Sequence, residues 1–248
     1  MKIKNFKHDL FDEIIYLKKV NSTIKQSFKL IKTRQIQGNF LLIAKEQTKG
    51  IGRRQREWFS PSGGLWLSAN FYGLSVSSNL TIFTGISLHQ TLSLLYPQIK
   101  KYFKLKWPND VYFQDKKIAG ILTNHYQAYQ YHSIGIGINS NFTKFQPELK
   151  QKANSLQNVL GYKLNNRKLL VNFFDIYKKN LPLLIDDGLN AEYFNKYSLL
   201  KNQSVTIATE YDSFQGISRG INKEGAIMIK MKNGMIQPFY GGTISKKN

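Results

Sequence analysis

The chain has 248 residues, of which 42% are hydrophobic and 13% aromatic, and this composition predicts one or two folded domains and excludes extended disorder. The chain contains no cysteine, which excludes disulfides, thiolate metal sites and a cysteine nucleophile. The formal net charge of +21 fits nucleic-acid binding, an anionic substrate or acidic partner, or lysines that only cover solvated faces, and the scattering of lysine along the chain favours the last.

Hydrophobic periodicity predicts a helix, two strands and a longer helix in the first hundred residues. Asn21, Ser22 and Thr23 stand just before apolar residues that recur at helical spacing, so a capped amphipathic helix is expected to begin there. The next expected elements are two strands and a helix, at Phe40–Ala44, Leu65–Phe71 and Leu80–Tyr96.

Four short strand candidates follow, separated by polar turns, at Lys104–Trp107, Val111–Phe113, Lys117–Thr123 and Tyr131–Ile138. Strands so close together in the sequence favour a mixed or antiparallel sheet. Beyond Asn165, apolar residues at helical spacing predict a helix that ends near Pro182, and a shorter helix is expected over Leu189–Tyr197.

From about Leu200 the pattern changes to short alternating segments with glycine at the turns, at Ser204–Ala208, Phe214–Ile221, Ala226–Lys230 and Met235–Tyr240. A β module of this length suits a five-stranded barrel. We therefore expect two domains, an α+β domain over residues 1–198 and a β domain over residues 199–248.

A glycine- and arginine-rich stretch runs from Gln47 to Pro61. Gly50 and Gly52 open a loop that Arg53, Arg54 and Arg56 then fill. Glycine lets backbone N–H groups approach an anion, and guanidinium groups bind phosphate in a bidentate manner, so the loop predicts an anion site. A basic surface turn is the alternative. The spacing matches neither a dinucleotide fingerprint nor a P-loop.

Two further segments carry candidate chemistry. Asn109 and Asp110 follow Trp107-Pro108 in a turn at a strand end, where they suit a metal or a ligand, although an ordinary Asx turn has the same residues. Lys117 begins an apolar strand, so an inward-pointing ammonium would need an anion, and the alternative is a surface lysine. Gly135 and Gly137 lie within a strand, where glycine indicates close approach of a ligand or of another backbone.

These segments together resemble the biotin protein ligase family. The motifs are Gly-x-Gly-Arg-Arg-x-Arg-x-Trp-x-Ser-Pro from Gly50, Lys-Trp-Pro-Asn-Asp from Lys106 with Lys-x-x-Gly-Ile-Leu from Lys117, and Gly-x-Gly-Ile-Asn from Gly135. The tail from Phe214 to Ser245 is similar to that family's C-terminal domain. The resemblance implies an α+β catalytic fold like that of class II aminoacyl-tRNA synthetases, a mixed β-sheet with helices on one face, and a small SH3-like barrel.

The resemblance also implies roles for residues. ATP would activate biotin as biotinyl-5′-AMP with release of pyrophosphate, and the biotin would then pass to a lysine. Lys117 and Arg53 would be the catalytic cations, because carboxylate attack on a phosphate brings two anions together. The biotin-binding residues would be Ser22, Thr23, Gln47, Gly52, Arg53, Lys117, Gly135 and Gly137, with the two strand glycines leaving room beside the biotin rings. The adenylate-binding residues would be Arg53, Arg56, Trp58, Asn109, Asp110, Lys117 and Asn139, with Asp110 also a ligand of Mg²⁺.

Three positions depart from the family pattern. Ile24 stands in place of an asparagine, Ile51 in place of an arginine and Gln55 in place of a glycine. One cation is therefore missing from the loop, and Gln55 does not adopt glycine's backbone conformations at low cost. An apolar Ile51 is expected to pack over biotin instead.

The resemblance implies a biotin carboxyl carrier protein of a carboxylase, such as acetyl-CoA carboxylase, as the acceptor. About 20 residues precede Asn21, too few for a winged helix-turn-helix, so we expect the monofunctional class without specific DNA binding. No membrane span or secretory signal is visible, so a cytoplasmic location is expected. The expected oligomeric state is a monomer or a homodimer. Lipoate protein ligase is the alternative within the same chemistry, and a basic nucleic-acid-binding module is the alternative of another class.

Overall fold

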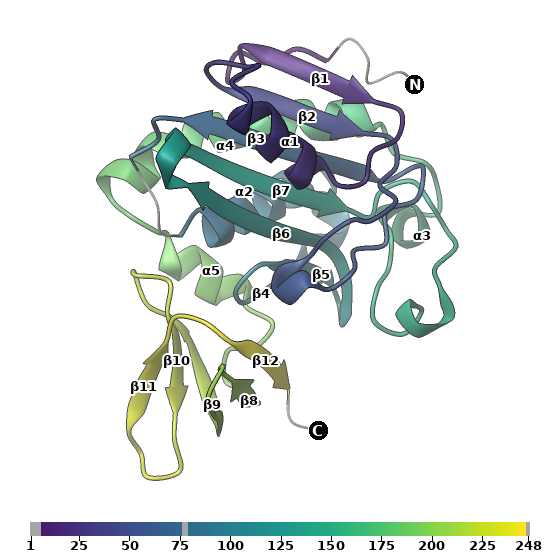
Figure 1. The fold of residues 1–248 in the computed structure, drawn as a ribbon. Helices are drawn as coiled ribbons and strands as arrows, with labels where there is room; N and C mark the ends of the chain where they lie inside the picture. Colours follow the sequence, from purple (N-terminus) through teal and green to yellow (C-terminus); the bar gives the residue numbers. More distant parts are fainter. Residues whose placement is uncertain (1–5, 76–78, 247–248) are drawn as a thin grey trace.

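A seven-stranded mixed sheet forms the centre of the protein in the computed structural model, which describes residues 6–75 and 79–246 (Figure 1). The strand order is β1-β2-β3-β7-β6-β5-β4; β1 and β2 are parallel, and the other neighbouring pairs are antiparallel. The strands are β1 (Glu13–Leu17), β2 (Phe40–Ala44), β3 (Leu65–Tyr72), β4 (Phe103–Lys106), β5 (Asp110–Phe113), β6 (Lys116–Tyr126) and β7 (Tyr131–Ile138).

The two long helices cover one face of this sheet, and a short helix lies on the other (Figure 1). Gly85 of α2 (Leu80–Leu95) faces the side chain of Ile121 on β6, and Tyr177 of α4 (Asn166–Asp186) stacks on Phe71 of β3 with ring centroids 5.6 Å apart. Ile24 of α1 (Thr23–Lys32) packs against Gly135 on the opposite face. The expected helices on one face are thus α2 and α4, and α1 is an addition on the face where the candidate site lies.

Strand β3 is buried on both faces. Leu65, Leu67, Ala69 and Phe71, which alternate as predicted, belong to the main hydrophobic core. Between them, Asn70 points to the other face, where its Nδ2 donates to Ser27 Oγ of α1 at 3.2 Å and to the Phe40 carbonyl at 3.2 Å. These hydrogen bonds satisfy the buried amide nitrogen and fix α1 against the sheet.

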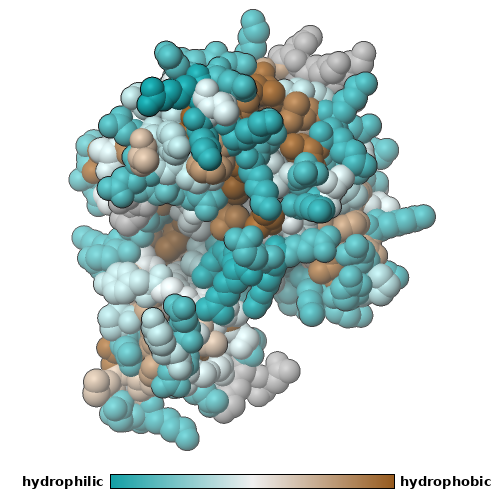
Figure 2. All heavy atoms as spheres, in the orientation of Figure 1, coloured by the Kyte–Doolittle hydropathy of each residue, from teal (hydrophilic) through white to brown (hydrophobic). Residues whose placement is uncertain are grey.

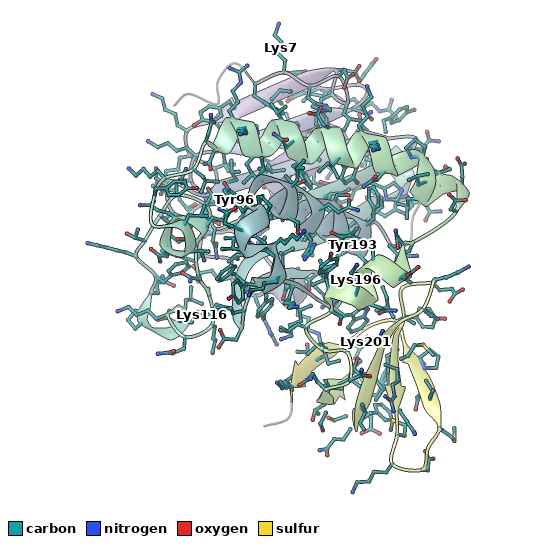
Figure 3. All side chains as sticks on the ribbon, turned by 180° about the vertical axis from the view of Figure 1, so that it is seen from behind. Lys7, Tyr96, Lys116, Tyr193, Lys196 and Lys201 are labelled. Carbon is teal, nitrogen blue, oxygen red and sulfur yellow. The ribbon has the colours of Figure 1, made fainter. Side chains whose placement is uncertain are left out.

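A second sheet of five antiparallel strands follows the short helix α5 (Ala191–Tyr197), in the order β11-β10-β9-β8-β12. The five strands bear out the predicted β module and are β8 (Ser204–Ala208), β9 (Ser213–Ile221), β10 (Ile227–Lys230), β11 (Ile236–Phe239) and β12 (Thr243–Lys246). Figure 3 shows Tyr193 and Lys196 of α5 directly above this sheet. The division predicted between residues 198 and 199 falls between α5 and β8 and stays a prediction.

Hydrogen bonds join the second sheet to the first. Trp107 Nε1, at the end of β4, donates to the Gly225 carbonyl in the turn between β9 and β10 at 2.9 Å. Asn195 of α5 exchanges two hydrogen bonds with the backbone of Ile221, at 2.7 and 2.8 Å. Because an indole and an amide inside the contact both find backbone partners, the two sheets have a defined relative position.

Some expectations at element ends were wrong. Helix α4 continues past Pro182 to Asp186, because Leu184 in its last turn is buried and its packing outweighs the hydrogen bond that proline removes. Ser22 is the N-cap residue of α1, but its side chain accepts no capping hydrogen bond. The Thr23 N–H at this helix start donates instead to Gln47 Oε1 at 2.8 Å.

Within the described residues, no helix is both long and apolar enough to cross a membrane.

Candidate active site

A cavity of about 460 Å³, called the main cavity here, opens on the face of the sheet that carries α1. Figure 2 shows hydrophobic side chains gathered in a hollow of this face between hydrophilic ones. Every site residue predicted from the sequence lines the main cavity, namely Ser22, Thr23, Gln47, Gly52, Arg53, Arg56, Trp58, Asn109, Asp110, Lys117, Gly135, Gly137 and Asn139. The fold thus brings together positions that are up to 117 residues apart, from Ser22 to Asn139.

One end of the main cavity is a polar cluster at the start of α1. Gln47 Oε1 accepts hydrogen bonds from the backbone N–H and the hydroxyl of Thr23, at 2.8 and 3.1 Å, and Gln47 Nε2 donates to Ser60 Oγ at 2.8 Å. Gly50 lies so close to this cluster that a Cβ there would come within 2.4 Å of the Trp58 carbonyl. Glycine is therefore required at position 50 by close approach, and Gln47 is held rigid by both ends of its amide.

The arginine loop turns on residues with left-handed backbone. Arg54 and Gln55 have φ of 55° and 58°, a region that side chains other than glycine occupy at a cost. The expectation that Gln55 occupies a position suited to glycine is therefore confirmed. The Gly52 N–H donates to the Arg56 carbonyl at 2.8 Å, so it serves the turn and does not present itself to an anion as the sequence suggested.

Arg53 and Arg54 extend from this loop to the second sheet. Arg53 donates to the Gly242 carbonyl at 2.9 Å and to Asn109 Oδ1 at 3.4 Å, and Arg54 donates to the Ala208 carbonyl at 3.5 Å. Gly242 and Ala208 lie at the same end of the paired strands β8 and β12. The loop is thus tied to the second sheet by its cationic side chains.

Lys117 points into the main cavity, where its ammonium meets a carboxylate and an aromatic ring. Lys117 Nζ lies 2.6 Å from Asp110 Oδ1 and 4.7 Å from the centre of the Trp58 ring. Both side chains of the ion pair are largely buried, with 24% and 15% of their surface exposed. The anion that the sequence required beside an inward-pointing Lys117 is supplied, in the ligand-free protein, by Asp110.

Asp110 faces further cations. It raises the pKa of Arg53 and of Lys106, although burial, the larger effect in both cases, lowers each pKa below its ordinary value. Lys106 Nζ lies 3.4 Å from the hydroxyl of Tyr112, whose pKa is raised by burial. Among the described residues that line the main cavity, six are cationic and only Glu57 and Asp110 are acidic. This excess of positive charge suits a polyanion.

The two glycines of β7 do not leave open space, in contrast to the expectation from the sequence. A Cβ on Gly135 would lie 2.3 Å from Ile24 Cδ1, and one on Gly137 would lie 2.4 Å from Trp58 Nε1. The glycines therefore accommodate protein side chains, and Ile24, which departs from the family pattern, fills the space above Gly135. The indole N–H of Trp58 is buried and finds no hydrogen-bond acceptor among residues 6–75 and 79–246. A ligand oxygen at this point would satisfy it.

Asn139 also lines the main cavity, and its amide nitrogen is engaged in structure. Its Nδ2 donates to the carbonyl of Asn154 at 3.0 Å and to that of Lys117 at 3.4 Å. Backbone hydrogen bonds also join Lys117 to Lys152 and Asn154, at 3.0 Å each. Asn139 thus holds the segment 152–154 beside Lys117, and any contact that it makes with a nucleotide stays a prediction.

Sequence reasoning missed several lining residues. Phe145, Leu149 and Lys152 come from the connection after β7, and Thr243 and Ile244 come from the second sheet. The connection after β7 has no motif. Thr243 and Ile244 lie in the tail that resembles the family's C-terminal domain, but they reach the cavity only through tertiary packing, which no local signal indicates. Lys106 and Tyr112 did have a signal, because they flank the Asn109-Asp110 turn on strands β4 and β5.

Comparison with known sequences gives matches over both parts of the chain. The model of the "Biotin/lipoate A/B protein ligase family" matches residues 16–141, and that of the "Biotin protein ligase C terminal domain" matches residues 202–247. The "Bifunctional ligase/repressor BirA" of Escherichia coli is 31% identical over 216 residues, which are 83% of this chain. This chain covers 66% of the length of that relative.

A solved structure is similar to almost the whole of this chain. The biotin protein ligase from Aquifex aeolicus in complex with biotin and ATP superposes with a TM-score of 0.83 at 27% sequence identity, and the match covers 96% of this chain and 100% of the other. The "Biotin--[acetyl-CoA-carboxylase] ligase" of Paracoccus denitrificans is 31% identical over 129 residues, 50% of this chain and 52% of its own length.

Proposed function

The chain belongs to the biotin/lipoate A/B protein ligase family, and we propose that it acts within that family as an ATP-dependent biotin protein ligase. In the first step the carboxylate of biotin attacks the α-phosphate of ATP, which gives biotinyl-5′-AMP and pyrophosphate. In the second step a lysine amine of a carrier protein attacks the acyl carbon, which gives the amide and releases AMP. The observation that carries the proposal is the convergence of Lys117, Arg53 and Lys106 on one side of a cavity with a polar cluster at one end.

The cations address the main obstacle to the first step. A carboxylate and a phosphate at about 4 Å repel each other by about 4 kcal/mol at an effective dielectric constant of about 20. Lys117 would contact both anions, since its ammonium lines the main cavity and is paired with Asp110, a protein carboxylate whose place a substrate anion would take. Fixed cations need no reorganisation when charge develops, and this makes them effective in a transition state.

Biotin is assigned to the polar cluster at the start of α1. Ser22, Thr23 and Gln47 offer hydroxyl and amide groups in fixed positions, and Ile24, Ile51 and Trp58 add apolar surface for a bicyclic ring and an aliphatic chain. A volume of about 460 Å³ is within the usual range for small-molecule sites. The nucleotide is assigned to the end lined by Asn139 and Phe145, where the ring of Phe145 provides a flat apolar surface.

Magnesium fits this site only together with the nucleotide. Within the described ranges no three acidic or histidine side chains converge on one point, so Asp110 would be the protein carboxylate and phosphate oxygens would complete the shell, as is common for Mg²⁺. The ion would neutralise charge on the phosphates. Asp110 would have to loosen its contact with Lys117 as the ion arrives, which would free the lysine ammonium for the substrate.

Biotin is preferred to lipoate because of the second sheet. The match of residues 202–247 to the C-terminal domain of biotin protein ligases supports this choice, as does the similarity to an Aquifex aeolicus enzyme whose structure contains biotin and ATP. We further propose that the acceptor is a biotin carboxyl carrier protein of a carboxylase. The excess of lysine and arginine over acidic residues would speed association with an acidic domain.

The test is pyrophosphate release before any acceptor is added. Purified protein with ATP, Mg²⁺ and biotin is expected to release one pyrophosphate per enzyme in a rapid burst and to retain biotinyl-5′-AMP. Parallel reactions contain lipoate in place of biotin, or EDTA. Release of pyrophosphate with lipoate and none with biotin would show that the protein is a lipoate protein ligase and would contradict this proposal.

A further inference from the structure

A second cavity, of about 390 Å³, lies between the N-terminal end of α2 and the second sheet, and we call it the side cavity. It adjoins the main cavity, since Arg53, Trp107, Pro108, Ile121 and Leu122 line both. The side cavity therefore lies next to the main cavity, with Arg53 in the wall between them.

The walls of the side cavity suit an aliphatic chain with a polar tip. Ile82, Pro108 and Leu122 provide apolar surface. Thr81 and Thr123 add two hydroxyls, hydrogen-bonded to each other at 2.9 Å. A lysine side chain has this character, because its methylene stem lies along apolar surface while its ammonium keeps polar contacts.

The charge of the side cavity differs from that of the main cavity. The described residues that line the side cavity include one cation, Arg53, and one carboxylate, Glu224, whereas six cations and two carboxylates line the main cavity. An ammonium that approached the reaction centre through the main cavity would be repelled. An approach past Glu224 meets one cation instead of six, which reduces this repulsion, and it adds an attraction.

The mouth of the side cavity is accessible to another protein and is held in a fixed position. Glu224 is exposed, and Tyr240 has 70% of its surface exposed. The turn that carries Glu224 is anchored by the hydrogen bond from Trp107 Nε1 to the Gly225 carbonyl. Both mouth residues lie in turns between strands of the second sheet, so this part of the chain would contribute directly to recognition of the acceptor.

We propose that the side cavity admits the lysine side chain of the acceptor protein, an inference that rests on the proposed function. Glu224 binds the ammonium at the mouth, and the amine gives one proton to solvent before it passes along the hydroxyls of Thr81 and Thr123. The amine nitrogen then forms a bond to the acyl carbon of biotinyl-5′-AMP. The bond from that carbon to the phosphate oxygen breaks, AMP leaves with the electron pair, and the second proton of the amine is released to solvent.

The experiment separates the two half-reactions in the full-length protein. The burst of pyrophosphate is measured without acceptor, and transfer is then started with a biotin carboxyl carrier domain as the probe. Thr81→Phe narrows the side cavity without changing the lining of the main cavity, and Thr81→Ser is its matched control. Glu224→Gln removes the carboxylate at the mouth, and Glu210→Gln is its control, because Glu210 is an exposed acid of the second sheet that does not line the side cavity.

We expect all four variants to give the wild-type burst. Thr81→Phe should then lower the rate of transfer at least tenfold, and Glu224→Gln should raise the KM for the carrier domain roughly threefold, the range of one exposed charge pair. Both controls should transfer like wild type. Wild-type transfer by Thr81→Phe would overturn the inference, and so would an equal loss of burst and transfer. Absence of a burst in the wild-type protein would instead refute the proposed function.

Discussion

Replacement of Lys117 by glutamine removes the ammonium that we place at the centre of the first step. The side chain keeps much of its length and can still donate hydrogen bonds, so the change isolates the charge. Loss of one fixed group that stabilises a developing oxyanion costs about 3–4 kcal/mol in other enzymes, which is roughly a hundredfold to a thousandfold in rate, and we expect loss of the ammonium charge to cost a similar amount. Lys117 and Asp110 are only 24% and 15% exposed, so the effect should exceed the 0–1 kcal/mol typical of surface pairs.

The assay is a single turnover with enzyme in excess over labelled biotin, quenched at short times and analysed for biotinyl-5′-AMP. Lys116→Gln is the matched control, because the neighbouring lysine lies outside the main cavity, with its Nζ 3.1 Å from the Lys150 carbonyl. Circular dichroism and a urea titration establish that both variants are folded. A single-turnover rate in Lys117→Gln within a few-fold of that of Lys116→Gln would show that the charge of Lys117 has no role in the transition state.

Three further predictions follow from the described contacts. Gln55→Gly should raise the midpoint of thermal unfolding by roughly 1–4 °C, because glycine adopts the φ of 58° without the conformational strain that glutamine has there, a net gain in stability of about 0.5–1 kcal/mol. A lower midpoint would contradict this. Arg53→Ala should still form the adenylate but release it about tenfold faster or more, because the change removes a cation that lines the main cavity and ties the arginine loop to the second sheet. Untargeted biotinylation of bystander lysines measures the leak. His89 is buried in α2 and hydrogen-bonded to the Phe103 carbonyl, and burial lowers its pKa from 6.5 to about 4. Between these two pKa values the unfolded chain binds more protons than the folded protein. The free energy of unfolding should therefore fall as the pH drops below 6.5, by about 1.4 kcal/mol per pH unit. Urea titrations at several pH values should show that His89→Gln flattens this slope.

The elements that could be predicted from the sequence are those whose pattern is local. Tyr131–Ile138 and Ser204–Ala208 have the predicted bounds, because alternating apolar residues end at clear turn signals. Strand β1 was missed. Its five residues, Glu13–Leu17, have no alternation and form a strand through parallel pairing with Phe40–Ala44, which lies more than twenty residues further along the chain.

The same distinction holds for the site. The motifs identified the residues that line the main cavity, since each motif lies at the end of a strand or in the loop over the sheet. The motifs did not identify which groups already have partners. Asp110 is paired with Lys117. Ile24 fills the space above Gly135, and the indole of Trp58 fills the space above Gly137. Such pairing depends on the three-dimensional positions of side chains that are distant in sequence.

The charge of the main cavity gives a physical reason for the fold to retain buried cations. Burial lowers the pKa of Arg53 and of Lys106, which means that the fold keeps their charged forms at a cost in free energy. Asp110 compensates only part of that cost, because it is shared with Lys117. An anion that binds between these side chains recovers the remainder, and salt screens a partly buried interaction less than it screens the attraction of exposed lysines for nucleic acid. The positive charge of the chain therefore has two physically distinct parts, a scattered one on solvated faces and a small buried one, and only the buried one has the geometry to bind a phosphate specifically.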